Sequence, residues 1–148
     1  MAQLIGYPTG KVLAVFDTPE ASEAAIAAIQ AAVAEGMAAG RVERFHGKAD
    51  ADRFDATGRR HGLVARGLRA MQFSLMDQLP AMAWYEAALR EGRVVVAVGT
   101  TSRAATLRVV EALRGTGAHF INRFGRFDTE EFARWRGPEP AVHDWMKH

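Results

Sequence analysis

Two stretches of the chain combine an apolar run with a helical repeat behind it. Residues 11–16 read KVLAVF and residues 93–98 read RVVVAV, and such β-branched runs are typical of buried central strands. Small polar residues suited to a helix N-terminus follow each run. The pattern therefore predicts helices from about 19 to 35 and from about 102 to 114.

The remaining elements are predicted from weaker patterns. Apolar and polar residues alternate well enough at 41–46 and 119–124 to indicate two more strands. Between these strands, apolar residues recur with helical spacing in 48–92, which predicts a helical insertion. Asp128 or Thr129 is expected to cap a last short helix that runs through Trp135. The helix stripes place certain residues inward and one outward. Expected inward are Ser22, Ile26, Ile29, Val33, Met82, Tyr85, Leu89, Leu107, Val110 and Leu113, and expected outward is Trp84.

The two halves of the chain repeat each other. VLAVFDT begins at Val12 and VVAVGTT begins at Val95, which pairs Thr18 with Thr101. We therefore predict an α+β fold of the ferredoxin-like type, a duplicated βαβ unit with a four-stranded antiparallel sheet and a helical insertion between the halves. The length of 148 residues suits a single domain. Its predicted parts are 11–47 (first unit), 48–92 (insertion), 93–136 (second unit with a short helix) and 137–148 (tail).

Composition excludes several classes of protein. The chain has no cysteine, so disulfides, thiolate nucleophiles and cysteine-bound zinc are excluded, and 49% apolar residues argue against disorder. No segment reaches the length of a membrane span and no signal peptide is evident, so a cytoplasmic location is expected.

Basic residues give little support to nucleic-acid binding. The net charge is only +2. The one clear arginine cluster, Arg59, Arg60, Arg66 and Arg69, could bind RNA or anionic lipid, but a solvated helix face is the favoured interpretation. The central strands carry aliphatic residues where stacking rings would be required, so nucleic acid is not an expected partner.

Candidate pocket residues come from the polar side chains of the strands and the insertion. They are His61, Tyr85, His119, Asn122 and His46. In a regular strand His119 and Asn122 would lie on opposite faces, so only a bulge could bring them to one pocket. A histidine pair on neighbouring strands, His46 with His119, could bind a metal or an anion, but no third ligand has suitable spacing, so no metal is predicted. For His119 a partly buried structural imidazole is favoured over an acid–base or ligand-binding role, and the sequence does not identify a cofactor.

Two further groups of residues allow a functional and a structural interpretation. Thr100, Thr101 and Ser102 begin a helix, where amides favour phosphate, but no Walker lysine or GxGxxG accompanies them and N-capping is favoured. Phe73, Trp84 and Trp145 lack an evident place in one core and are candidates for a subunit interface. The group Met71, Phe73, Met76, Met82, Trp84 and Tyr85 could line a pocket for a flat apolar ligand. A packed helical hairpin or a dimer contact is the favoured interpretation of this group.

Several motifs resemble a known family. VLAVFDTPEASEAAIAAI and WYEAALREGRVVVAV resemble the two halves of the bacterial general-stress and heat-induced-stress domain. HGLVARGLR and GAHFINRFGRFDTEEF are similar to an uncharacterised bacterial group of that type. The resemblance implies an α+β fold and a stress context, and it implies no reaction.

Three functional hypotheses follow from these observations. The first is a non-catalytic, homo-oligomeric small α/β protein. The second is an enzyme or small-ligand-binding protein of the dimeric ferredoxin-like type, with a pocket between the insertion and the sheet. The third is nucleic-acid binding through the helix that carries Arg59 and Arg69.

Overall fold

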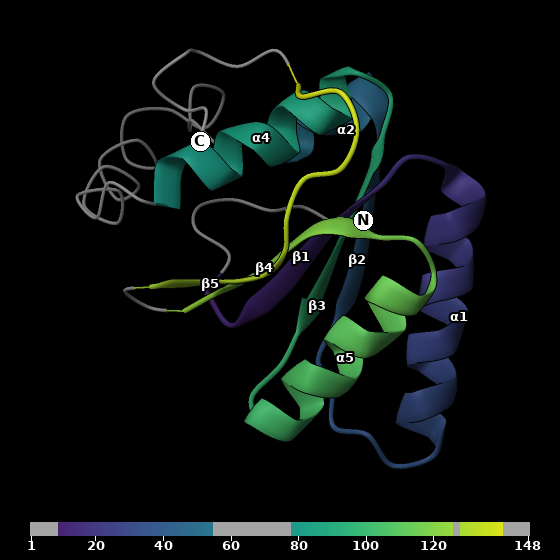
Figure 1. Ribbon diagram of the computed structural model, residues 1–148. Helices are drawn as coiled ribbons and strands as arrows, with labels where there is room; N and C mark the ends of the chain where they lie inside the picture. Colours follow the sequence, from purple (N-terminus) through teal and green to yellow (C-terminus); the bar gives the residue numbers. More distant parts are fainter. Residues whose placement is uncertain (1–8, 55–77, 126–127, 141–148) are drawn as a thin grey trace.

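One open antiparallel sheet of five strands organises the chain. The computed structural model describes residues 9–54, 78–125 and 128–140, and in these ranges four helices accompany the sheet (Figure 1). The strand order is β2-β3-β1-β4-β5. The elements are β1 (Lys11–Phe16), α1 (Pro19–Ala34), β2 (Val42–His46), α2 (Gly47–Phe54), α4 (Gln78–Arg90), β3 (Val94–Gly99), α5 (Arg103–Gly115), β4 (His119–Phe124) and β5 (Thr129–Ala133).

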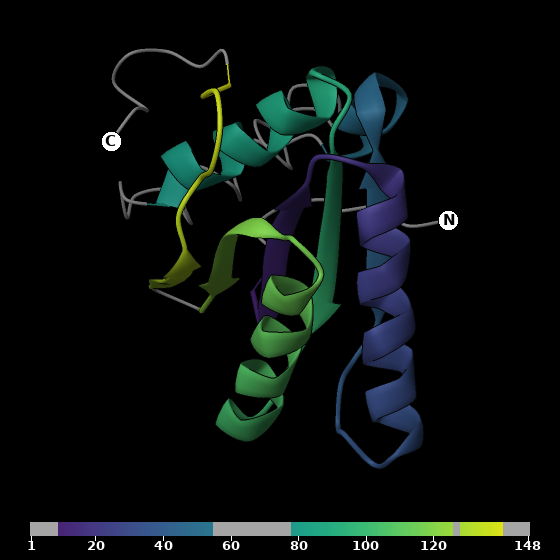
Figure 2. The same ribbon diagram turned by 45° about the vertical axis from the view of Figure 1, so that its right-hand side comes forward.

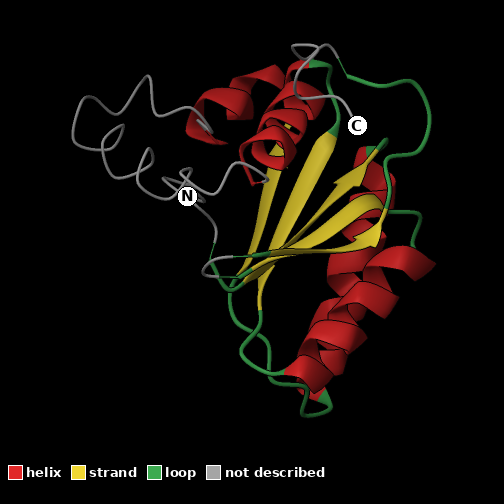
Figure 3. Cartoon of the chain, turned by 60° about the vertical axis from the view of Figure 1, so that its left-hand side comes forward, coloured by secondary structure: helices red, strands yellow, loops and turns green. Residues whose placement is uncertain are grey.

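The sheet is the middle of three layers. Successive side chains of the neighbouring strands β1 and β3 point to opposite faces and are buried on both, as expected for central strands. Helices α1 and α5 cover one face, while α2 and α4 cover the other (Figures 2 and 3). The described parts of the insertion, α2 and α4, therefore cover the sheet of their own chain.

The α1 and α5 layer begins with two side-chain caps. The Thr18 hydroxyl accepts a hydrogen bond from Ala21 N at 3.3 Å, and the Ser102 hydroxyl accepts one from Ala105 N at 3.1 Å. The inward stripes are shorter than predicted. Val33, at the last turn of α1, is 42% exposed, and Leu107 is 47% exposed because α5 turns Thr106, Val110 and Leu113 toward the sheet.

The layer of α2 and α4 packs on the opposite face. Met82, Tyr85 and Leu89 are buried against the sheet as predicted. Trp84 was predicted to point away from this stripe, and that prediction is wrong, because only 3% of Trp84 is exposed. The neighbouring ring of Phe120, on β4, gives the indole an apolar contact inside the chain.

The last short helix predicted for 128–135 is a strand. Residues Thr129–Ala133 form β5, which pairs with β4 through the register Phe124 with Thr129. Gly125 N donates to Asp128 O at 2.8 Å and closes the turn between the two strands. The helix signals here are local, and pairing with the open edge of β4 overrides them, which gives five strands instead of the predicted four.

The alignment of the two halves that was predicted from the sequence is shifted by one residue in the structure. Val12 packs on the side of α1 and α5, whereas Val95, its predicted counterpart, packs on the side of α2 and α4. A shift of one residue moves a strand residue to the other face. The helix caps show the same offset, because Thr18 corresponds to Ser102 and not to Thr101.

Two leucines of α5 test this arrangement. We expect Leu113→Ala to lower the free energy of unfolding by about 2–5 kcal/mol, because Leu113 is fully buried. Leu107→Ala, on the same helix, should change it by less than about 1 kcal/mol. Urea unfolding followed by circular dichroism measures both, and equal losses would contradict the orientation of α5.

Candidate functional site

A bulge in β4 determines the arrangement of the candidate site. Val15 pairs with His119 and Leu13 pairs with Asn122, so one residue of β1 faces two residues of β4. Phe120, one of these two, has a backbone φ of 49°, in the left-handed region that bulky residues rarely adopt. Because Leu13 and Val15 face α4, the bulge brings His119 and Asn122 to that same face.

Tyr85 of α4 is bonded directly to the bulged strand. Its hydroxyl lies 2.6 Å from Phe120 O and 3.0 Å from Leu13 O, and Asn122 Nδ2 donates to it at 3.0 Å. Complete burial raises the pKa of Tyr85 far above its ordinary value, so the phenol stays protonated. Two of the predicted pocket residues, Tyr85 and Asn122, are thus brought together as a structural contact between helix and sheet.

Removal of the Tyr85 hydroxyl should destabilise the fold. We expect Tyr85→Phe to lower the free energy of unfolding by about 1–3 kcal/mol, because Asn122 Nδ2 and Phe120 O lose this buried partner. In a double-mutant cycle with Asn122→Leu, the two losses should not add. Additive losses in chemical denaturation would contradict a direct contact.

His119 is held between the start of α1 and the segment after β5. Arg136 N donates to His119 Nδ1 at 3.1 Å, so the ring proton is on Nε2 and is donated to Asp17 Oδ1 at 2.8 Å. Burial lowers the pKa of His119, and the bond to Asp17 offsets this only in part. Partial burial acts to raise the pKa of Asp17, but the hydrogen bonds from His119 and Arg93 outweigh it and leave that pKa below its ordinary value.

These contacts predict a pH dependence of stability. In the unfolded chain His119 takes up a proton near its ordinary pKa of about 6.5, whereas in the fold it does so at lower pH. The stability contributed by neutral His119 is therefore lost as pH falls from about 7.5 through 6.5 toward the folded pKa. The charged groups facing the ring are Asp17, Arg93 and Arg136, and Asp17 adds a separate loss only near pH 4.

The pH prediction can be measured by thermal unfolding between pH 7.5 and 5.5. His119→Asn should flatten the profile in this window, and it should be less stable than the parent protein at pH 7.5. His46→Asn, at the exposed end of β2, is the control for loss of a histidine. An unchanged slope in His119→Asn would show that another group is responsible.

His46 and His119, considered from the sequence as a possible pair, do not lie on neighbouring strands. Strands β3 and β1 lie between β2, which carries His46, and β4. His46 N instead donates a hydrogen bond to Asp50 Oδ2 at 2.8 Å, near the start of α2. Within 9–54, 78–125 and 128–140, no three histidine or acidic side chains are grouped so that they could hold a metal ion.

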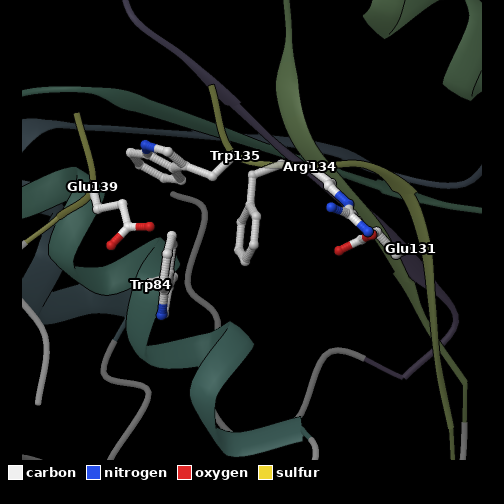
Figure 4. A pocket seen from close by; sticks show the side chains of 6 residues that line it. Trp84, Glu131, Arg134, Trp135 and Glu139 are labelled. Atoms are coloured by element: carbon white, nitrogen blue, oxygen red, sulfur yellow. Dashed lines mark ion pairs between the residues drawn. The ribbon is translucent and has the colours of Figure 1, made fainter. Parts of the chain in front are cut away.

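A pocket of about 500 Å³ opens beside the bulge (Figure 4). Its aromatic wall consists of Trp84, Phe120 and Trp135. The rings of Trp84 and Phe120 are stacked with centroids 5.4 Å apart, and Trp135 lies edge-on to both at 5.5 and 5.6 Å. Glu131, Arg134 and Glu139 complete the lining from the described residues.

Trp135 is fixed by contacts on several sides. Its indole N–H donates to Pro138 O at 2.8 Å, and its ring meets the His119 ring edge-on at 4.8 Å. The Arg93 guanidinium lies 5.2 Å from the ring centroid, within cation–π distance. His119 and Tyr85 are not among the described residues that line the pocket, yet His119 supports one of its walls.

Sequence reasoning found only part of this pocket. It named Trp84 both as an interface candidate and as a possible lining residue of an apolar pocket, and it placed Trp135 in a helix that does not form. TEEFA has no regular alternation of apolar and polar residues, so the strand-favouring Thr129 and Phe132 and the aromatic Trp135 just beyond them are the available local signals for an additional strand. The bulge changes which face of the sheet Phe120 occupies, so the sequence pattern alone could not assign Phe120 to the same wall as Trp84 and Trp135.

Two of the three predicted anion-binding residues, Thr100 and Ser102, are already bonded to their surroundings. Ser102 caps α5, and the Thr100 and Thr106 hydroxyls lie 2.8 Å apart. Arg123 Nε donates to the Thr100 hydroxyl at 3.3 Å. A hollow of about 220 Å³ adjoins Thr101 and Ser102, and the arrangement agrees with N-capping, the interpretation favoured from the sequence.

Other predicted site residues lie outside the described residues. They are His61, Phe73 and Trp145, together with Met71, Met76 and the arginines Arg59, Arg60, Arg66 and Arg69. The interface proposed for Phe73 and Trp145 therefore stays a prediction.

Comparisons with known proteins add no relative. No family model, curated protein or solved structure matches the chain. None of the helices in the described ranges combines the length and apolar character that a membrane crossing requires.

Proposed function

We propose that this protein binds a small organic molecule in the pocket between α4, β4 and the segment after β5. The observation that carries the proposal is the wall of three aromatic rings, Trp84, Phe120 and Trp135, around a volume of about 500 Å³. Ligand sites are commonly hollows of about 300–1,000 Å³ with aromatic walls and few polar groups.

Binding is favoured over catalysis because the candidate acid–base groups are occupied. Burial and three polar contacts keep the Tyr85 hydroxyl in place, and both ring nitrogens of His119 have partners. Neither side chain reaches the pocket from the described part of the chain. A general acid or base has to be within hydrogen-bond distance of the group on which it acts.

The proposal includes a fold family. We interpret β2-β3-β1-β4 as a ferredoxin-like sheet of two βαβ units, with β5 as an added edge strand. The antiparallel neighbours β1 and β3, each the first strand of its half, support this interpretation. The stress context and self-association stay predictions. Trp84, which had suggested an interface, has its contacts inside the chain.

A fragment screen by NMR tests the binding proposal. The probes are small aromatic amines, alcohols and acids, added to the ¹⁵N-labelled full chain. We expect the indole N–H signals of Trp84 and Trp135 to shift with at least one probe class, and Trp135→Leu to weaken that binding by about 10-fold or more.

The control variant is Phe132→Leu. Phe132 is on β5, three residues before Trp135, but packs on the side of α1 and α5, so its loss should leave binding unchanged. Circular dichroism establishes that both variants fold. Absence of binding by every probe class, or equal weakening in the two variants, would refute the pocket as a binding site.

A further inference from the structure

The charge of the pocket indicates which ligands it accepts. Its described lining carries two carboxylates and one guanidinium. Arg134 Nε lies 3.6 Å from Glu131 Oε1, so this guanidinium is already matched by a carboxylate (Figure 4). The second carboxylate, Glu139, has no ion-pair partner among the residues that the structure describes, and the lining is therefore negative by one charge.

Like the negatively charged lining, the aromatic wall favours a positively charged ligand. The face of an aromatic ring is the negative part of its quadrupole and attracts ammonium and guanidinium groups, most strongly in tryptophan. Among the described residues the same attraction holds the Arg93 guanidinium over Trp135 at 5.2 Å and the Arg103 guanidinium over Phe132 at 5.5 Å. In Figure 4 the Glu139 carboxylate points toward the Trp84 indole, so rings and carboxylate border one space.

We infer that the pocket binds organic cations, namely molecules with an ammonium or guanidinium group on an apolar body. The apolar body would lie against Trp84, Phe120 and Trp135, and the cationic group would lie near Glu139 at the mouth. This inference rests on the proposed function and adds the chemical class of the ligand. Anionic ligands are disfavoured because Glu131 already neutralises Arg134.

Three probes of similar shape separate charge from ring contact. Benzylamine is cationic at pH 7.5, benzyl alcohol is neutral, and benzoate is anionic. We expect benzylamine to bind about 10-fold more tightly than benzyl alcohol, and benzoate to bind most weakly, in NMR titrations at low salt. Benzyltrimethylammonium, which cannot donate a hydrogen bond, should also bind more tightly than the alcohol.

Variants assign the charge preference to Glu139. Glu139→Gln should reduce the preference of the pocket for benzylamine over benzyl alcohol by about 3-fold or more, while the affinity for the alcohol stays the same. Glu111→Gln, an exposed position on α5, is the matched control and should have no effect. Raising the salt from 0.05 to 0.5 M should weaken the amine and leave the alcohol unchanged.

The possible outcomes separate this inference from the proposed function. Equal binding of amine and alcohol, with both shifting the Trp84 and Trp135 indole signals, would overturn the cation preference and retain the pocket as a binding site. Tighter binding of benzoate would overturn it as well. If neither these probes nor the wider fragment set shifts those signals, both the inference and the proposed function are refuted.

Discussion

The contact between the Tyr85 hydroxyl and the bulge of β4 supports the arrangement of the candidate site. A non-glycine residue with φ of 49° costs roughly 1–3 kcal/mol and persists only where its surroundings hold it. Tyr85 supplies a hydrogen-bond donor to Phe120 O, and the Phe120 ring packs against Tyr85 and Trp84 at 4.9 and 5.4 Å. Aromatic pairs contribute about 0.5–1.5 kcal/mol each, so these contacts are of the right size to offset the strain.

The same bulge links the two halves of the pocket wall. It turns His119 toward the side of α4, where the ring accepts a hydrogen bond from the segment after β5 and packs against Trp135. Phe120 N also donates to Arg134 O at 2.9 Å, which fixes the start of that segment. A change in the protonation of His119 therefore acts on a pocket wall, although His119 does not line the pocket.

Local sequence signals were sufficient for the central part of the fold. Strands 11–16 and 119–124, the start of α1 after small polar residues and the inward stripe of α4 depend on neighbours in the sequence, and all were predicted. Features set by distant contacts were missed. The strand β5 depends on the open edge of β4, the burial of Trp84 depends on Phe120, and the bulge depends on the contact with Tyr85. The region 55–77, in which the sequence placed His61 and Phe73, lies outside the described residues.

The position of the backbone strain is itself an argument for the pocket. A regular β4 would avoid the left-handed conformation, but alternation along it would then put Phe120 and His119 on opposite faces. The aromatic wall and the support of Trp135 by His119 could not then form on the same side of the sheet. Strained residues cluster at binding and catalytic sites because the unusual backbone directs side chains there. In this chain it directs Phe120 into the wall that Trp84 and Trp135 complete.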